Sequence, residues 1–537
     1  MKSAARTWEL AGAAALAAAV LAPMADTDLW WHLSAGRAFL DGGAWPRVEL
    51  ASWTLRGAPW TDFEWLAQAQ FAAVRLVGGA WGLWLLKGLL LAAAAGGVLA
   101  TARAAALAAP GRAAALALFA AGVLPRADLR TELCSLALFA WLMYWLECLR
   151  AADWPRKSFK SLVIGCACLF AGWANLHGGF PLGLVLLGSY LLAPARRHPS
   201  WLLALVAAAA GTLINPYGFG LWSVVLGHGR DAGGLSPLIS EWSPLGFSQA
   251  GHYGAWLTVL AATGVVALAA LRGKAPALPE LFALALAAST VRHVRLAGYA
   301  AVVAPLLAAA AARLSHGLWE RARPRLAAAA LCGAAFWICL SAAKPWRLVY
   351  GAYDPVLVPV EAAAWLAPRK DLLALPMYNP WSWGGYLADR LKVPVFQDGR
   401  YLFHGLLAEQ AEAVKSPEAW QAFLYKKGAG LVLLENGPLM RDTTLKAPDG
   451  TSIPVQRPYY VAYMPREDWA LVWFDDAALV FVRRDMLPMG TREFRWLKPR
   501  DGKALAEARR LGLIDEMGLA AEAALHAAER PSVEFPL

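Results

Sequence analysis

Apolar runs separated by short polar turns dominate the first 343 residues. A helix that crosses a bilayer needs about 17–25 mostly apolar residues, and runs near this length recur throughout this region. We therefore predict eleven membrane-spanning helices, near residues 7–23, 81–102, 112–125, 132–149, 159–175, 180–194, 200–215, 253–271, 277–292, 296–312 and 326–343. The pattern predicts a polytopic α-helical membrane domain over residues 1–343.

A long polar loop, residues 24–65, follows the first predicted span. Within it, residues 28–40 have the pattern of a short amphipathic helix. A second interfacial helix is predicted over residues 63–77, and the Gly78-Gly79 pair is expected to end it.

The last third of the chain, residues 344–537, predicts a soluble α/β domain. Short apolar runs at 371–376, 393–396 and 430–435 are expected to be buried strands, with a helix over 417–427 between them. Residues 469–482 predict a β-hairpin that turns at Asp475-Asp476. Residues 501–530 have a helical, alanine-rich pattern.

Composition agrees with a membrane protein that carries a soluble part. Of 537 residues, 58% are hydrophobic and 17% are charged, against about 25% charged in an average soluble domain. The net charge of +11 does not require a nucleic-acid partner, because Lys and Arg retained in cytoplasmic turns give the same sign. We expect the bilayer, and no nucleic acid, as a partner.

The charges divide between the two sides of the predicted bundle. With a cytoplasmic N-terminus, the inner turns hold basic clusters with few acids, as the positive-inside rule requires. The outer turns combine acids, histidines, amides and arginines. They hold Asp26, Asp28, His32, Asp62, Glu64, Arg126, Asp128, Arg130, Glu132, Asn175, His177, Asn215, Tyr217, Glu241, Arg292, His293 and Arg295. This asymmetry predicts a functional cavity that opens outward.

The acids Asp26 and Asp28 stand where the chain leaves the first span, followed by Trp30, Trp31 and His32. Tryptophan favours the membrane interface, whereas carboxylates there are costly unless they meet water, a cation or a ligand. Such a pair suits a general base, a metal site or an ordinary solvated loop end. The residues alone leave these three alternatives open.

Arginines on the outer face are candidates for binding phosphate, because the planar guanidinium matches phosphate oxygens. They also have structural interpretations: Arg126 and Arg130 can snorkel to lipid headgroups, and Arg292 and Arg295 can pair with Glu241. Two further outer motifs have structural alternatives: a helix cap at His177, and a turn at Asn215-Pro-Tyr-Gly218. In the soluble domain, Asp398 and Arg400 either form a structural turn or help to bind an acceptor.

The acidic pair in the first outer loop, the charged outer face and the C-terminal soluble domain resemble the GT-C superfamily of membrane glycosyltransferases. Its members include protein O-mannosyltransferases, lipid A aminoarabinose transferases and oligosaccharyltransferases. Two loop motifs resemble a poorly characterised bacterial group more closely: Asp26-Thr-Asp-Leu-Trp-Trp-His-Leu-Ser-Ala-Gly36 and Pro59-Trp-Thr-Asp-Phe-Glu-Trp-Leu66. Phe63 departs from this group's pattern, which has histidine there.

Further matches to that group extend the resemblance over nearly the whole chain. They are Asn175-Leu-His-Gly-Gly-Phe180, Asn215-Pro-Tyr-Gly218, Trp383-Gly-Gly-Tyr386 and Phe396-Gln-Asp-Gly-Arg400.

The resemblance implies an enzyme of the cell envelope in the bacterial cytoplasmic (inner) membrane, with an extracytoplasmic C-terminal domain. Its donor would be a polyprenyl-phosphate-linked sugar, and its acceptor a glycan, lipid or protein at the outer face. Asp26 or Asp28 would be the catalytic base or would orient the acceptor. Some members hold a divalent metal with such acids and others do not, so Asp26, Asp28 and His32 are candidate ligands of Mg²⁺ or Mn²⁺.

Two other classes of function remain open at this stage. A non-catalytic transporter or lipid-carrier flippase would also need a polar cavity, but it should show internal repeats or broken helices with mid-membrane charges. We find no clear repeat, and Lys87 is the one strong mid-span charge in the sequence. A membrane assembly protein whose soluble domain docks a partner is the third class.

Overall fold

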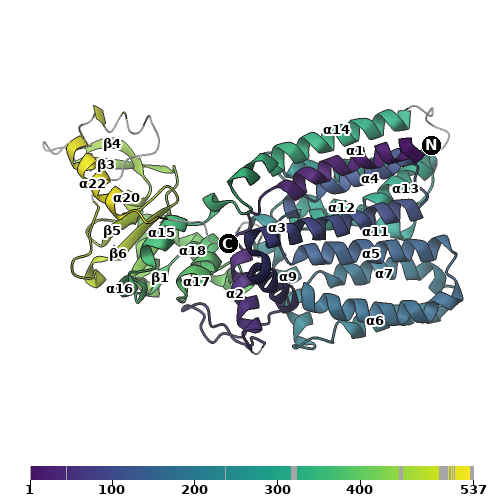
Figure 1. Cartoon of the computed structure of the whole chain (residues 1–537), viewed down its shortest axis with the longest axis horizontal. Helices are drawn as coiled ribbons and strands as arrows, with labels where there is room; N and C mark the ends of the chain where they lie inside the picture. The colour runs from purple at the N-terminus through teal and green to yellow at the C-terminus, as the bar shows by residue number, and fades with distance from the viewer. Residues whose placement is uncertain are drawn as a thin grey trace. The chain divides into compact units, whose positions relative to one another are not determined.

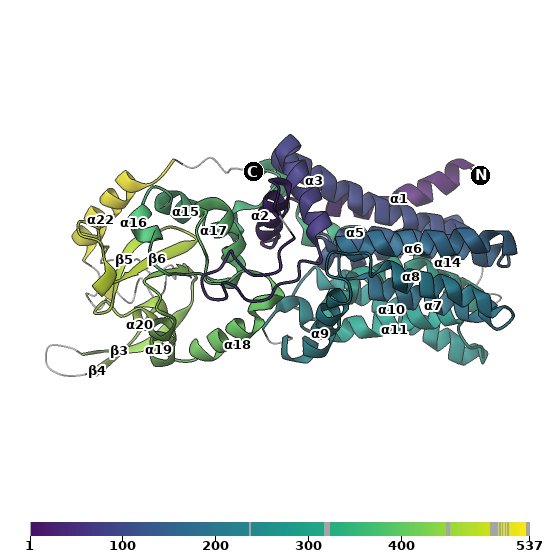
Figure 2. The same ribbon diagram turned by 90° about the horizontal axis from the view of Figure 1, so that it is seen from below.

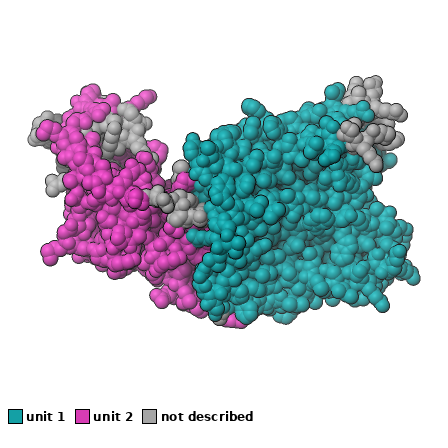
Figure 3. Space-filling view, viewed as in Figure 1, with its two compact units in different colours: residues 1–26, 35–46, 61–354 teal, residues 27–34, 47–60, 355–537 magenta. Residues whose placement is uncertain are grey.

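The computed structural model describes residues 2–43, 45–235, 238–315, 323–446, 452–494 and 515–532, with residues 503, 506, 509, 510 and 512. The chain forms two compact units (Figure 3). Unit 1 consists of residues 1–26, 35–46 and 61–354, and unit 2 of residues 27–34, 47–60 and 355–537. The first loop therefore contributes to both units.

Unit 1 is a bundle of helices that run side by side (Figure 1). The helices are α1 (Lys2–Leu21), α3 (Trp65–Ala104), α4 (Ala109–Gly122), α5 (Glu132–Ala151), α6 (Phe159–Leu176), α7 (Phe180–Ala195), α8 (Leu202–Gly211), α9 (Gly220–Leu235), α10 (His252–Arg272), α11 (Leu278–Arg292), α12 (Ala297–Val302), α13 (Ala304–Ser315) and α14 (Arg323–Ala343). Helix α2 (Leu29–Leu40) carries residues of both units. The predicted amphipathic helix over 28–40 is confirmed.

Small residues let the helices of unit 1 approach closely, as is common in membrane bundles. A Cβ atom at Gly254 of α10 would lie 1.9 Å from the carbonyl oxygen of Ala121 in α4. At Gly97 of α3 it would lie 2.7 Å from the side chain of Ala140 in α5. The alanine-rich composition of these helices thus has a direct packing consequence.

Five helices among the described residues are long and apolar enough to cross a membrane, or six if the bent pair Val294–Val302 and Ala304–Ser315 forms one span. Helices occupy every predicted span, but several are shorter than a bilayer requires, so the number eleven stays a prediction. The predicted break at Gly78-Gly79 occurs as a kink: Gly79 has φ 56° within the 40-residue helix α3.

Unit 2 contains a four-stranded sheet in the order β1-β2-β6-β5. Strand β1 (Met377–Tyr378) is parallel to β2 (Leu431–Glu435), whereas β6 (Ala478–Arg483) is antiparallel to both β2 and β5 (Trp469–Phe474). A separate hairpin pairs β3 (Met440–Lys446) with β4 (Ser452–Pro458). The predicted strand at 430–435 and the hairpin turning at Asp475-Asp476 are confirmed, and so is the α/β character of this region.

Helices cover the sheet of unit 2 in both views (Figures 1 and 2). Trp365 of α15, for example, stacks on Trp473 of β5 with ring centroids 5.4 Å apart. The helices are α15 (Val360–Leu366), α16 (Lys370–Leu373), α17 (Gly384–Leu391), α18 (His404–Ala413), α19 (Pro417–Lys427), α20 (Tyr460–Tyr463) and α22 (Glu516–Glu529). The helix predicted over 417–427 is confirmed.

Two of the predicted strands are wrong. Residues 370–373 form helix α16, because leucine and lysine favour a helix and this run has no β-branched residue. Residues 393–396 form no strand, and Val395 makes an isolated bridge to Ser52. Part of the helix predicted over 501–530 is present as α22, and most of residues 501–514 lie outside the described residues.

Candidate functional site

Six charged side chains form a connected ion-pair network at the ends of the helices in unit 1. Glu241, in the turn Ser240–Trp242, pairs with Arg126 at 3.1 Å, with Arg295 at 3.6 Å and with Arg130. Arg126 also donates to Glu132 at 2.6 Å. Arg130 pairs in addition with Asp26. We call Asp26, Arg126, Arg130, Glu132, Glu241 and Arg295 the arginine–acid cluster.

The arginine–acid cluster is partly open to solvent. The side chains of Asp26, Arg126 and Glu132 are at most 4% exposed, whereas those of Arg130 and Arg295 are 23% and 30% exposed. Buried charges of this kind are costly unless they are paired. The two exposed arginines leave part of their guanidinium surface accessible to an anionic ligand.

Burial and pairing oppose one another in the pKa values of this cluster. Burial alone would lower the pKa of Arg126, but Glu132 and Glu241 outweigh it and raise that pKa above its ordinary value. Burial alone would raise the pKa of Glu241, but Arg126 and Arg295 outweigh it and hold that pKa below its ordinary value. Both groups are therefore charged at neutral pH.

A second polar group joins α3, α5 and the end of α6. Glu64 accepts a hydrogen bond from Thr131 at 2.8 Å, and its carboxylate lies 3.7 Å from Nε2 of His177. The Gly179 amide donates to Nδ1 of His177 at 3.0 Å, and Ser135 Oγ lies 2.8 Å from the same nitrogen. Because Nδ1 accepts, a neutral His177 carries its proton on Nε2, the nitrogen that lies near Glu64.

Gly179 is required for this arrangement. A Cβ atom there would lie 2.0 Å from the hydroxyl oxygen of Tyr299 and 3.0 Å from Nδ1 of His177. Gly179 therefore allows the turn after α6 to pack against Ser135 of α5 and Tyr299 of α12. This is more than the helix cap that is the structural alternative for His177.

Several predicted site residues have mainly structural contacts. Asn175 accepts from Trp65 at 2.8 Å and donates to the carbonyls of Ala171 and Ile214. The other contacts are of the same kind: Asn215 accepts from the Tyr217 amide, Tyr217 donates to the Pro46 carbonyl, Asp62 accepts from Gln68, and His293 contacts the Trp242 carbonyl. These residues build turns and helix ends around the cluster.

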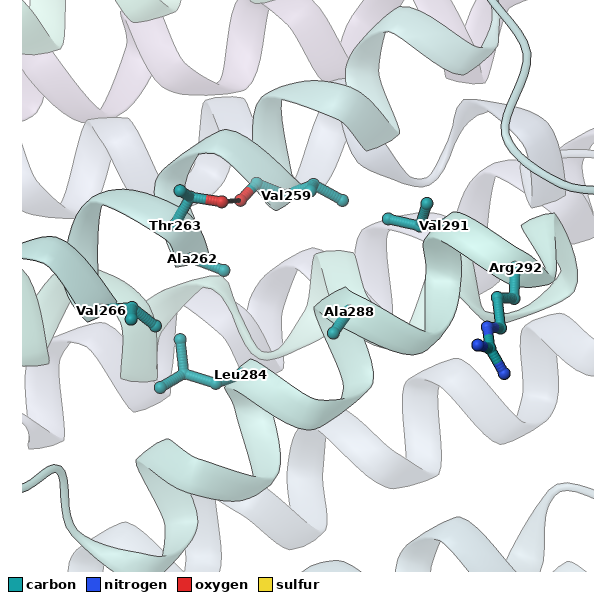
Figure 4. A pocket seen from close by; sticks show the side chains of 8 residues that line it. All are labelled: Val259, Ala262, Thr263, Val266, Leu284, Ala288, Val291 and Arg292. Atoms are coloured by element: carbon teal, nitrogen blue, oxygen red, sulfur yellow. Dashed lines mark hydrogen bonds between the residues drawn. The ribbon is translucent and has the colours of Figure 1, made fainter.

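Arg292 differs from the other arginines on this end of unit 1. It closes α11 and lines an apolar groove of about 350 Å³ between α10 and α11 (Figure 4). The other lining residues are Val259, Ala262, Thr263, Val266, Leu284, Ala288 and Val291. Among the described residues, no carboxylate forms an ion pair with Arg292. The groove thus combines hydrocarbon walls with one available cation.

The remaining predicted residues belong to unit 2. Arg400 is buried and donates to Asp398 at 2.8 Å and to Glu49. It also lies over the Trp60 ring, 4.5 Å from its centroid. Burial alone would lower the pKa of Arg400, but the two carboxylates outweigh it and raise that pKa above its ordinary value. Its guanidinium nitrogens are all engaged by carboxylates.

The first-loop motif packs on the C-terminal motifs within unit 2. A Cβ atom at Gly399 would lie 1.7 Å from the Asp28 carboxylate, and one at Gly385 would lie 2.8 Å from the Trp31 amide. His32 is buried, and its ring lies 3.7 Å from that of Trp31. The glycines of both C-terminal motifs therefore make room for residues 27–34.

The side chains of the described residues do not fit a metal site. No group of three or more His, Cys, Asp or Glu side chains in that part of the chain is placed to hold an ion. The acids of the arginine–acid cluster are bound by guanidinium groups instead.

Sequence reasoning missed several residues that the fold brings to this site: Thr131, Ser135 and Tyr299. It placed Glu132 among the charges of the outer turns, two residues after Arg130, but did not select it as a site residue. Ser135 and Tyr299 are single polar residues within apolar helices, a pattern that does not distinguish a site from a buried hydrogen bond.

Solved structures with the same fold are known. A structure of the Archaeoglobus fulgidus oligosaccharyltransferase tethered to an acceptor peptide with the NVT sequon aligns with 84% of this chain and 74% of its own, at 11% identity and a TM-score of 0.52. The complex of the same enzyme with zinc and sulfate aligns with 86% and 78% of the two chains, at 12% identity and a TM-score of 0.50.

The fold of this chain is therefore similar to that of the Archaeoglobus fulgidus oligosaccharyltransferase. ArnT from Cupriavidus metallidurans also aligns, over 88% of this chain and 97% of its own, at 14% identity and a lower TM-score of 0.43. No protein-family profile and no curated protein sequence matches the chain. The five or six described helices that are long and apolar enough to cross a membrane indicate a multi-pass membrane protein.

Proposed function

We propose that the protein is a membrane glycosyltransferase. It transfers a sugar from a polyprenyl-phosphate-linked donor to a glycan, lipid or protein acceptor at the outer face of the bacterial cytoplasmic membrane. The supporting observation is the arginine–acid cluster at one end of the helix bundle: a buried first-loop carboxylate, Asp26, pairs with the partly exposed Arg130, and the same network contains the partly exposed Arg295. Residues 344–537 form the extracytoplasmic domain in this proposal, and the N-terminus is cytoplasmic.

The anionic end of the donor is the part that these arginines suit. Guanidinium groups bind phosphate oxygens in a forked geometry, and Arg130 and Arg295 are the cluster's exposed examples. Arg292 adds a cation with no carboxylate partner among the described residues, at an apolar groove. A lipid that carries a phosphate suits both features, because its hydrocarbon chain can lie in the apolar groove while its phosphate binds Arg292.

The transfer step balances without a further reactant. The acceptor's hydroxyl or amine attacks the anomeric carbon of the sugar, and the bond between that carbon and the phosphate oxygen breaks. The phosphate leaves with the electron pair, and the arginines stabilise the charge that develops there. The acceptor's proton passes to the carboxylate of Asp26, as in general-base catalysis. Asp28, two residues on, is the alternative base.

Native mass spectrometry of the protein extracted gently from its own membrane tests the donor. We expect a co-purifying polyprenyl phosphate that carries a sugar, and its mass identifies both parts. Arg292→Leu should reduce this occupancy about tenfold, the cost of one charge-assisted contact. Arg196→Leu is the matched control, since Arg196 is also an exposed arginine at a helix end.

Two results would contradict the proposal. One is ordinary phospholipid alone, even after cells are fed labelled polyprenyl-phosphate sugars, which would favour a transporter, a flippase or an assembly protein. The other is an intact lipid-linked sugar that crosses proteoliposome membranes without being transferred, which would favour the flippase.

A further inference from the structure

Lys87 is a buried cation in the middle of helix α3, and it contacts the chain just before Asp26. Its side chain is 1% exposed, and its ammonium group donates to the Ala22 carbonyl at 2.5 Å. The Trp84 indole donates to the same carbonyl at 3.2 Å. A buried ammonium is expensive in a membrane helix, and the indole alone already gives this carbonyl a donor. The need to give the Ala22 carbonyl, just after α1, a hydrogen-bond donor therefore does not by itself explain a lysine at this position.

Asp128 binds the same segment from the turn after α4. Its carboxylate accepts from the Ala25 amide at 2.6 Å and from the Leu129 amide at 2.7 Å. Burial raises the pKa of Asp128, and the charge of Lys87 and these two amides oppose that shift. Arg130, two residues further along, pairs with Asp26 itself. One short turn thus holds both the backbone before Asp26 and its carboxylate.

A third set of contacts comes from the end of unit 1. The Met24 amide donates to the Ala352 carbonyl at 2.7 Å, and the Asp354 amide donates to the Met24 carbonyl at 2.8 Å. The Tyr353 hydroxyl donates to the Asp26 carbonyl at 3.2 Å. Residues 22–26 are therefore fixed from three directions, although they form no helix or sheet strand.

We propose that Lys87 and Asp128 are positioning residues that fix residues 22–26 and thereby orient the Asp26 carboxylate toward the reacting groups. This inference rests on the proposed function, because it needs Asp26 to take part in transfer. A displacement of about 1 Å at a catalytic group can cost about a hundredfold in rate, so a segment outside regular structure needs such fixing. A mid-membrane charge such as that of Lys87 is also expected in a transporter, but in this proposal the charge serves to fix residues 22–26.

Hydrogen–deuterium exchange of the full chain in lipid nanodiscs tests the positioning directly, without an activity assay. In Lys87→Met and Asp128→Ala, peptides that cover residues 22–28 should exchange at least about tenfold faster than in the wild type, as local opening becomes easier. The matched control is Thr101→Val, which removes another buried polar group of α3, whose hydroxyl donates to the Gly97 carbonyl. It should leave these peptides unchanged.

Transfer kinetics supply the second arm, with lipid-linked sugars isolated from cells fed radiolabelled glucose as the probe. The kcat of Lys87→Met and Asp128→Ala should fall about a hundredfold while KM changes little. Asp128→Asn keeps an oxygen that can accept from the Ala25 amide, so it should recover most of the kcat lost in Asp128→Ala. A purely structural role would lower the yield of folded protein without this recovery.

Three outcomes separate this inference from the proposed function. Faster exchange with unchanged kcat would overturn the positioning role, and so would unchanged exchange in both variants. A wild-type chain that transfers no sugar would remove the proposed function and with it the role in orienting Asp26, while the exchange arm would still report whether Lys87 and Asp128 hold the segment.

Discussion

The arginine–acid cluster of unit 1 and the group of Arg400, Asp398 and Glu49 in unit 2 look alike in composition. They differ in how much guanidinium surface they leave accessible to a ligand. In unit 2, Arg400 is 5% exposed and is enclosed by Asp398, Glu49 and the Trp60 ring. In unit 1, Glu241 is shared among arginines of which two are a quarter to a third exposed. A closed cluster contributes to folding, whereas an open one can also bind a ligand.

The difference is visible in the groups that surround each carboxylate. Both Glu49 oxygens are used, one by the Ser52 amide at 2.7 Å and one by Arg400. Both Asp398 oxygens accept from Arg400. Asp26, by contrast, lies in a segment held by its backbone, and its carboxylate meets an arginine that remains partly exposed. The contrast separates the residues that we expect to act on substrate from those that hold the fold.

Arg400→Met should give the largest effect on folding. It leaves Glu49 and Asp398 buried without their cation, and breaking a buried ion pair in this way costs about 3–5 kcal/mol. Thermal unfolding of the purified protein measures the loss. The control is Arg484→Met, which removes a partly exposed partner of Glu493 and should cost about 0–1 kcal/mol. Equal losses in the two variants would show that the closed cluster has no special weight.

Arg130→Gln should have the opposite balance of effects: a small loss of stability and a large loss of transfer activity. Because Arg130 is partly exposed, its loss should lower the midpoint of thermal unfolding less than the loss of Arg400 does. Transfer should nevertheless fall about a hundredfold, the usual effect of removing one group that stabilises developing charge. Steady-state rates and unfolding curves of the same preparation give both values. A variant that unfolds early yet transfers normally when folded would place Arg130 with the structural arginines.

The smallest expected effect is the difference between the wild type and Glu241→Gln in how much thermal stability they lose at acidic pH. The folded pKa of Glu241 lies below its ordinary value of 4.5, so its contribution to stability is present above pH 4.5 and is lost as the pH falls through the lower folded value. The midpoint temperature of thermal unfolding of the wild type should therefore decrease as the pH falls through that range. Glu241→Gln should start lower at neutral pH and lose roughly 2–4 °C less on acidification. Parallel curves for both proteins would contradict the pKa shift.

The sequence predicted the bundle better than it predicted the site. Apolar runs located the helices, and Gly78-Gly79 located the kink in α3, because both signals are local. The pairing of Arg295 with Glu241 was weighed as a structural alternative, but nothing in the chain distinguished it from Arg292, which has no carboxylate partner among the described residues. That distinction depends on where each side chain points at the end of α11.

The packing of the first-loop motif could also not be predicted from local sequence patterns. Asp26 and Asp28 are two residues apart, yet Asp26 belongs to unit 1 and Asp28 to unit 2. The Asp28 carboxylate lies against Gly399 across more than 370 residues of chain. Contacts of such sequence separation follow from the fold and have no periodic signature in the sequence.

The direct test of the central claim is sugar transfer in proteoliposomes by wild-type, Asp26→Asn and Asp28→Asn proteins with matched unfolding midpoints. An amide cannot take the acceptor's proton, so Asp26→Asn should lose at least about a hundredfold in kcat, and Asp28→Asn should lose much less. Loss in Asp28→Asn alone would move the base to Asp28. Full activity in both variants would contradict the account, because no first-loop carboxylate would then take part in the reaction.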